Sequence, residues 1–162
     1  MTSISITPTI NGVATTFEVQ PRMTLADALR DKVRLTGTHL ACEHGACGAC
    51  TVIVDGLAVR ACLMLAVQTD GAEIVTVEGL ADRGKLSALQ EAFLKHHAVQ
   101  CGFCTPGILT TMHALLTDEP DADEGRIREV LSGNLCRCTG YIPIVEAIME
   151  ARAAYTRTEP AA

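Results

Sequence analysis

Residues 42–50 of this 162-residue chain read Cys-Glu-His-Gly-Ala-Cys-Gly-Ala-Cys, and Cys62 follows after eleven further residues. The spacing of the four thiols is therefore C-x4-C-x2-C-x11-C. Two short apolar segments, Thr51–Val54 and Leu57–Cys62, flank an Asp-Gly dipeptide at positions 55–56, which is typical of a β-hairpin. Because this hairpin begins directly after Cys50, its turn can bring Cys62 back to the loop.

The spacing in this loop suits a [2Fe–2S] cluster. The C-x4-C-x2-C part is the plant-ferredoxin pattern, in which cysteine thiolates are presented by a backbone that curls around the bridging sulfides. Gly45 and Gly48 can adopt the positive φ angles of such a curl, and they leave amide N–H groups open to hydrogen-bond sulfur. Hydrogen bonds of that kind stabilise the reduced state. We therefore predict a redox-active cluster with the ligands Cys42, Cys47, Cys50 and Cys62.

Four further cysteines form a second set with the spacing C-x2-C-x31-C-x-C, made of Cys101, Cys104, Cys136 and Cys138. The first pair precedes an expected helix, and the second pair follows the end of another. An antiparallel helix pair would bring those two ends together. Since the positive end of a helix dipole favours an anionic tetrathiolate cluster, we predict a second iron–sulfur site here.

Two other uses of eight cysteines stay open at this point. Four thiolates also suit Zn²⁺, although zinc ribbons and fingers prefer C-x2-C pairs on both sides, and C-x4-C-x2-C and C-x-C are poor zinc motifs. A disulfide framework needs an oxidising compartment. The N-terminus has no basic residue before Arg22 and no apolar h-region, so we expect a cytoplasmic protein with reduced thiols.

Composition excludes several classes of function. The formal net charge of −6 argues against a nucleic-acid binder, which needs a basic face. The longest apolar run, residues 61–67, is too short to span a bilayer. Phosphate-binding glycine loops, the H-E-x-x-H zinc motif and a nucleophile with a convincing base are absent from the sequence, so we predict no catalytic residue in this chain.

The hydrophobic pattern changes its period near residues 79–85. Before them, strand-like alternation covers Ser3–Thr7, Thr15–Val19 and Glu73–Val77, and Thr24 can cap a short helix over Leu25–Val33. We predict an α+β fold with a sheet domain over residues 1–78, a linker over 79–85, a four-helix bundle over 86–155 and a flexible tail over 156–162.

Four apolar stripes with helical spacing define the expected bundle. They are Leu86, Leu89, Phe93 and Leu94; Ile108, Leu109, Met112, Leu115 and Leu116; Ile127, Val130 and Leu131; and Val145, Ile148 and Met149. Thr105 before Pro106, and Asp121 three residues before Glu124, are the expected N-caps of two of these helices.

Three longer motifs carry the cysteines in order. They are Cys42-Glu-His-Gly-Ala-Cys47-Gly-Ala-Cys50-Thr, Val99-Gln-Cys-Gly-Phe-Cys-Thr-Pro-Gly107 and Gly133-Asn-Leu-Cys-Arg-Cys-Thr-Gly-Tyr141. Together they resemble the iron–sulfur (small) subunit of the molybdenum hydroxylase, or xanthine dehydrogenase, family over about residues 3–155. As a separate short chain, the sequence resembles the small subunit of the three-subunit enzymes similar to carbon monoxide dehydrogenase. Residues 42–47 are nearer to the hydroxylases of aldehydes, N-heterocycles and aryl-CoA thioesters.

The resemblance implies a plant-ferredoxin-like β-grasp domain followed by a four-helix bundle, each binding one [2Fe–2S] cluster. In the family the helical-domain cluster is the inner one, next to the molybdopterin cofactor of a large subunit, and the ferredoxin-like cluster is the outer one, facing the FAD of a medium subunit. Carried onto this chain, the inner ligands are Cys101, Cys104, Cys136 and Cys138, and the outer ligands are Cys42, Cys47, Cys50 and Cys62. Gln100 matches the position that hydrogen-bonds the pterin, and Cys138 the ligand nearest the pterin amino group.

We therefore expect an electron-transfer subunit of a multi-subunit oxidoreductase. It would relay electrons from the molybdopterin centre of the large subunit through both clusters to FAD or another acceptor, within a dimer of heterotrimers. Substrate chemistry would then reside in a partner chain. The alternatives are a zinc-stabilised adaptor without a redox role and a stand-alone ferredoxin.

Overall fold

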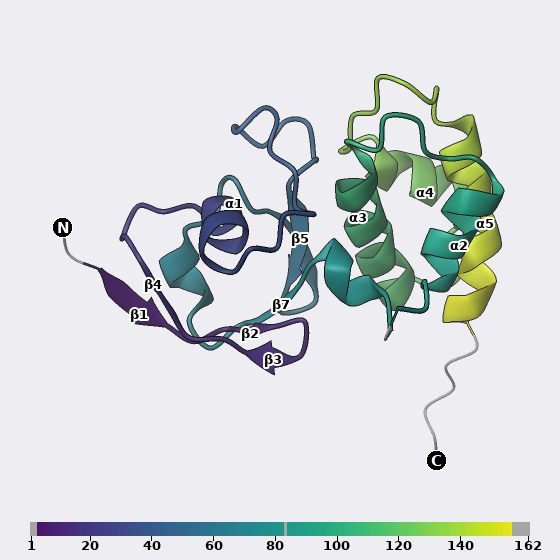
Figure 1. Cartoon of the computed structure of the whole chain (residues 1–162). Coiled ribbons are helices and arrows are strands. Elements are labelled where there is room, and N and C mark those ends of the chain that lie inside the picture. The colour runs from purple at the N-terminus through teal and green to yellow at the C-terminus, as the bar shows by residue number, and fades with distance from the viewer. Residues whose placement is uncertain (1–2, 83, 157–162) are drawn as a thin grey trace, which may run out of the picture.

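The structure is a computed structural model, and it describes residues 3–82 and 84–156. Figure 1 shows two parts side by side, a strand-rich N-terminal part and a helical C-terminal part, with strand β5 facing helix α3 between them. Each part has its own large cluster of buried apolar side chains. None of the helices in the described residues is long and apolar enough to cross a membrane.

The N-terminal part contains two sheets. Strand β1 (Ile4–Ile6) pairs with β4 (Phe17–Val19) in an antiparallel two-stranded sheet. The five-stranded sheet has the order β3-β2-β7-β5-β6, and only β2 and β7 are parallel neighbours. Its members are β2 (Thr9–Ile10), β3 (Val13–Ala14), β5 (Thr51–Val54), β6 (Leu57–Arg60) and β7 (Glu73–Val75). The predicted hairpin after Cys50 is thus confirmed as β5–β6.

A short helical segment packs against the five-stranded sheet. Helix α1 (Leu25–Asp27) begins at Thr24, whose side chain accepts a hydrogen bond from the Asp27 amide, as predicted. It continues as a π-helical segment, η1 (Ala28–Lys32), so the expected single α-helix widens after its first turn. Leu25 and Leu29 are fully buried in one core with Val52 and Ile74, and this core holds α1 and η1 against the strands.

The C-terminal part is a bundle of four helices, as expected. These are α2 (Ala88–Lys95), α3 (Thr105–Asp118), α4 (Glu124–Leu131) and α5 (Ile142–Tyr155), and α2 packs along α5. Two 3₁₀ segments, η2 (Ala66–Thr69) and η3 (Val77–Leu80), precede the bundle. The largest fully buried side chains of the bundle are Phe93, Leu89, Ile108, Met112, Leu116, Ile127, Ile144 and Ile148. The predicted stripes on α3 and α4 face this core, except that Val130 is only partly buried.

Other details of the predicted helices are wrong. Leu86 lies before α2 and is 38% exposed, and Leu94 is 61% exposed because α2 buries its Leu89–Phe93 face against α5. Thr105 is the first residue of α3 rather than its cap, and no side chain caps this helix, because Cys104 occupies the capping position. Helix α4 is capped by Asp123, whose carboxylate accepts from the Arg126 amide, and not by Asp121.

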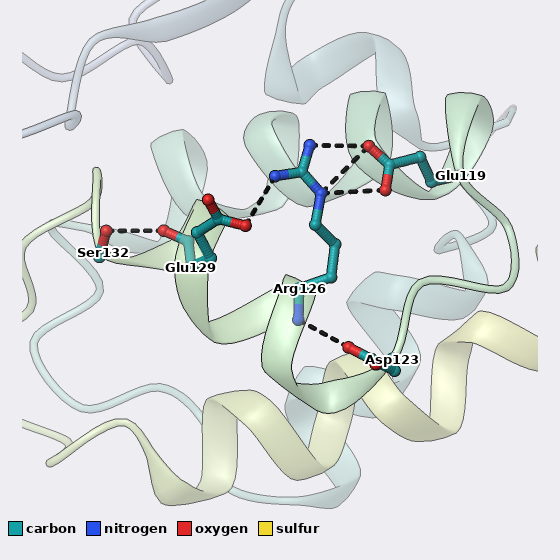
Figure 2. A network of polar contacts seen from close by, with 5 residues as sticks. All are labelled: Glu119, Asp123, Arg126, Glu129 and Ser132. Atoms are coloured by element: carbon teal, nitrogen blue, oxygen red, sulfur yellow. Dashed lines mark hydrogen bonds and ion pairs between the residues drawn. The ribbon is translucent and has the colours of Figure 1, made fainter.

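A polar network fixes the link between α3 and α4. The Arg126 guanidinium donates to both carboxylate oxygens of Glu119 and also to Glu129, as Figure 2 shows. The hydrogen bond from Arg126 lowers the pKa of Glu119. These side chains are partly exposed to solvent, so the network positions the loop more than it stabilises the fold.

The two parts are joined by hydrogen bonds as well as by packing. The Thr110 hydroxyl on α3 is buried and donates to the Thr51 carbonyl oxygen on β5 at 2.8 Å. The Arg60 guanidinium at the end of β6 donates to the Thr51 hydroxyl at 2.5 Å and to the Gly133 carbonyl oxygen, just after α4, at 2.6 Å. Arg60 therefore ties the five-stranded sheet to the helical part.

Candidate iron–sulfur sites

The first four cysteines lie where the sequence places them, in a tight loop that ends just before β5 and, for Cys62, just after β6. Gly45 and Gly48 have φ angles of +83° and +75°, which confirms the predicted curl. A Cβ atom at Gly45 would lie 2.5 Å from the Leu63 side chain, and one at Gly48 would lie 2.5 Å from the Gly133 carbonyl oxygen. The loop therefore needs glycine at both positions for space as well as for conformation.

The thiols of this set differ in environment. Hydrogen bonds from the backbone of His44 and Cys47 lower the pKa of the half-buried Cys42 to about 6, and the Cys47 amide lies 3.3 Å from the Cys42 sulfur. Burial raises the pKa of Cys50 to about 11, and Cys62 is its buried neighbour. A backbone that directs N–H groups at sulfur favours the thiolate that a metal ion requires.

The second four cysteines are brought together from two loops. Cys101 and Cys104 lie between α2 and α3, and Cys136 and Cys138 lie between α4 and α5. The sulfur atoms of Cys101 and Cys138 are 3.5 Å apart, and Cys104 contacts Cys136. The predicted meeting of the two helix ends is thus confirmed.

Exposure divides this second set into two pairs. Cys101 and Cys138 are exposed at the surface, whereas Cys104 and Cys136 are partly buried. Burial raises the pKa of Cys104 to about 12, and the neighbouring Cys136 thiol adds to this effect. Burial raises the pKa of Cys136, but hydrogen bonds from Thr139, from the Cys138 backbone and from Cys104 together outweigh it, so the pKa of Cys136 is lowered. The exposed pair is the part of the site that another molecule can reach.

Two residues near Cys136 were not singled out from the sequence. The Thr139 hydroxyl lies 3.1 Å from the Cys136 sulfur, and the Tyr141 hydroxyl accepts a hydrogen bond from the Cys136 amide at 2.8 Å. Tyr141 has a φ angle of +69°, which is unusual for a residue other than glycine. Nothing in the local pattern of the sequence signals these contacts, because they depend on the course of the loop.

The two cysteine-bearing regions lie against each other at the same end of the molecule (Figure 1). The amide of Leu135, next to Cys136, donates to the Cys47 carbonyl oxygen at 2.8 Å. The Asn134 side chain is buried and donates to the Gly48 carbonyl oxygen at 3.0 Å. The backbone of one cysteine loop is thus hydrogen-bonded directly to the backbone of the other.

Four histidines form polar contacts with backbone or side-chain oxygens. His39 donates to the Phe103 carbonyl oxygen and stacks on the Phe103 ring, and His44 donates to the Cys42 carbonyl oxygen. His96 pairs with Glu150. His113 is half-buried and hydrogen-bonds the Tyr155 hydroxyl at 2.8 Å.

The residues present fit two iron–sulfur clusters. All eight thiols are free, and they form two sets of four with backbone N–H groups and a hydroxyl directed at sulfur. In residues 3–82 and 84–156, no three His, Cys, Asp or Glu side chains form a group able to hold a single metal ion. Gln100 is exposed and directly precedes the exposed Cys101.

Comparison with known proteins identifies both halves. Residues 8–81 match the 2Fe-2S iron–sulfur cluster binding domain, and residues 76–149 match the [2Fe-2S] binding domain. The gamma subunit of caffeine dehydrogenase from Pseudomonas sp. (strain CBB1) is 56% identical over 91% of this chain and 90% of that subunit. The nicotine 6-hydroxylase small subunit of Paenarthrobacter nicotinovorans is 55% identical over 91% of this chain and 89% of its own length. The chain belongs to the small [2Fe–2S] subunits of the molybdenum hydroxylases.

Solved structures agree with this assignment. The chain superimposes on quinoline 2-oxidoreductase of Pseudomonas putida 86 with a TM-score of 0.93 and 52% identity, over 97% of this chain and 98% of that one. It also matches the aldehyde oxidoreductase of Desulfovibrio gigas, with a TM-score of 0.91, but over only 18% of that longer chain. The predicted α+β fold, a ferredoxin-like β-grasp part followed by four helices, is confirmed. The molecule is an iron–sulfur electron-transfer subunit of a multi-subunit oxidoreductase, with two [2Fe–2S] binding domains.

Proposed function

We propose that Cys101, Cys104, Cys136 and Cys138 ligate an inner [2Fe–2S] cluster, and that Cys42, Cys47, Cys50 and Cys62 ligate an outer one. Each cluster, when bound, supplies a one-electron carrier. The proposed division into two cluster-binding domains, residues 1–78 and 86–155 joined by 79–85, is supported by the two separate apolar cores. The proposed tail, residues 156–162, lies outside the described residues beyond Thr156.

One observation carries the proposed relay. The two cysteine loops are joined by the hydrogen bond from Leu135 to Cys47, so a backbone route leads from one proposed ligand set to the other without passing through solvent. The buried Asn134 and the Arg60 guanidinium hold the loops in this position. In this proposal the chain keeps two carriers at a fixed separation.

We further propose that electrons enter at the helical site and leave at the ferredoxin-like site. Cys101 and Cys138 are the exposed thiols of the inner set, and Gln100 beside them offers both a donor and an acceptor to the pterin of a molybdopterin cofactor in a large subunit. Exposed apolar side chains lie close in sequence to the cysteines of this set, namely Val99, Phe103, Leu135 and Ile142. Such a group is typical of a surface that a partner covers.

The proposed partners follow from the same relay. The relatives are themselves named as gamma, small or beta subunits. We propose a complex of this chain with the molybdopterin-binding large subunit and an FAD-binding medium subunit, assembled as a dimer of heterotrimers. Because all eight thiols are free, we place this complex in the cytoplasm.

Metal analysis combined with EPR tests the ligand assignment. Purified complex is expected to contain four irons and four acid-labile sulfides per copy of this chain, and to give two distinct [2Fe–2S] signals on reduction. Cys104→Ser should abolish one signal and Cys50→Ser the other. Stoichiometric zinc in place of iron would overturn the assignment. So would a single substitution that removes both signals although the part of the molecule without the substitution stays folded.

For the substrate of the complex we propose an N-heterocyclic compound. Relatives named for caffeine, nicotine and quinoline are 52–56% identical to this chain, whereas the E. coli aldehyde oxidoreductase subunits are 42–43% identical. Anaerobic reduction of the clusters by quinoline or nicotine, compared with benzaldehyde, tests this. Reduction by the aldehyde alone would contradict it.

A further inference from the structure

The loop after Cys138 contains a hydroxyl group that is directed at a proposed ligand. The Thr139 oxygen lies 3.1 Å from the Cys136 sulfur and also accepts a hydrogen bond from the Tyr141 amide at 3.2 Å. Since the amide uses a lone pair of the oxygen, the hydroxyl proton is free to point at sulfur. A thiolate ligand carries no proton. When the cluster is bound, only the Thr139 hydroxyl can therefore donate the hydrogen bond between Thr139 and the Cys136 sulfur.

The local backbone is arranged to keep this hydroxyl in place. Gly140 and Tyr141 both have a φ angle of +69°, and the chain reverses so that the Tyr141 amide reaches back to Thr139. The Tyr141 hydroxyl accepts the amide proton of Cys136 at 2.8 Å. That N–H group is thereby directed to oxygen rather than to the sulfur of its own residue. A residue with a side chain at positive φ carries conformational strain, which the two hydrogen bonds offset.

We propose that Thr139 sets the reduction potential of the inner cluster, and that Tyr141 is the residue that positions it. The proposal rests on the ligation of that cluster by Cys136. Reduction adds one negative charge to the cluster, and a hydroxyl donor to a ligand sulfur stabilises the more negative state. Removal of the donor therefore makes the cluster harder to reduce and leaves it oxidised at potentials where the native site accepts an electron.

The test is an EPR-monitored redox titration of the complex with Thr139→Val, which is nearly isosteric, and Thr139→Ser, which keeps the hydroxyl. The inner signal is the one abolished by Cys104→Ser. In Thr139→Val we expect the ratio of reduced to oxidised inner cluster, at a fixed potential, to fall about tenfold, which is about 59 mV for a one-electron couple. Loss of one hydrogen bond to a charged group changes such a ratio by about tenfold or more. Thr139→Ser keeps the hydroxyl donor, so we expect its ratio to stay within about twofold of the native one. The outer signal should be unchanged in both.

Other outcomes overturn the proposal. The proposal is wrong if the reduction potential of the inner cluster is unchanged in Thr139→Val that carries both clusters. It is also wrong if Thr139→Ser shifts this potential as much as Thr139→Val does. If Thr139→Val does not load the inner cluster, Thr139→Ala is titrated instead, and failure of both to load assigns Thr139 a structural role only. Iron content and the two EPR signals of the native complex test the ligand assignment separately. An unchanged potential in Thr139→Val can therefore be distinguished from a wrong ligand assignment.

Discussion

Gly107 on α3 packs directly against the carbonyl group of Gly48 in the first cysteine loop. A Cβ atom at Gly107 would lie 2.2 Å from the Gly48 oxygen and 2.9 Å from the Ala49 oxygen. Both neighbours are backbone atoms that also belong to the turn leading into β5, so they cannot move aside alone. Helix α3, which begins at the second cysteine set, therefore packs directly on the loop that carries the first set.

Gly107→Ala is expected to force the two parts of the molecule apart. Overpacking of this kind costs about 1–3 kcal/mol in the free energy of unfolding, and here it strains the loop that holds Cys47 and Cys50. Thermal unfolding of the loaded complex, together with the two EPR signals, measures the effect. Gly125→Ala on α4 is the matched control, because its Cβ would approach only the Asp123 carboxylate, at 3.3 Å. Equal stability of both variants would contradict the packing argument.

Arg60→Gln should loosen the contact between the sheet and the helical part. The variant loses the donors to the Thr51 hydroxyl and the Gly133 carbonyl oxygen, and leaves these partly buried acceptors unpaired. The expected loss is about 1–3 kcal/mol in the free energy of unfolding, with slower transfer between the clusters. Chemical denaturation and stopped-flow reduction measure the two effects. Arg22→Gln, at an exposed position, should change neither. A comparable loss of unfolding free energy in Arg22→Gln would show that the effect comes from removing a positive charge and not from the hydrogen bonds of Arg60.

Stability is expected to depend on pH through His113. Burial lowers the pKa of His113 below its ordinary value of 6.5, so the folded chain keeps the ring neutral while the unfolded chain binds a proton near pH 6.5. Below that pH the unfolded state binds more protons, and the stabilisation that is fully present at higher pH is lost as the pH falls towards the lowered folded-state pKa. Denaturant unfolding at pH 7.5 and pH 5.5 should show this loss.

His113→Gln is expected to lose less stability between those two pH values than the native chain, since its side chain does not titrate. The exposed His97, which has a φ angle of +51°, gives the control His97→Asn, because Asn tolerates that conformation. His97→Asn should follow the native pH dependence. An identical pH dependence in His113→Gln and the native chain would rule out His113 as the group responsible.

The two clusters are expected to be unequal in function. Cys62→Ser should leave the inner cluster reducible by substrate and block transfer onward to the acceptor, because the proposed transfer is sequential. Cys138→Ser should impair exit of electrons from the partner's cofactor at the first step. Anaerobic EPR after addition of substrate distinguishes the two variants. The proposed order is wrong if Cys62→Ser keeps an inner cluster that dithionite reduces and substrate does not.

The sequence by itself determined the chemistry and most of the local conformation. The spacing of the eight cysteines predicts the proposed ligands, and Gly45 and Gly48 have the positive φ angles that the spacing requires. The apolar periods separate strands from helices and predict the buried faces of α3 and most of α4. These features are encoded within a few residues, by steric limits on φ and by the side-chain repeat of each element. The capping errors at Thr105 and Asp121 arise because several nearby residues satisfy the same local rule.

Only the tertiary structure decided how the two cysteine loops meet. Asn134 and Gly48 are 86 positions apart, and their hydrogen bond exists because β5 packs on α3 and brings both loops to one end of the molecule. The contact of Thr139 with Cys136 likewise depends on the positive φ of Tyr141, which no residue pattern demands. Such contacts follow from the shapes of complete packed surfaces and from the need to pair buried polar groups. Those conditions are set by the whole chain at once, and no short segment contains them.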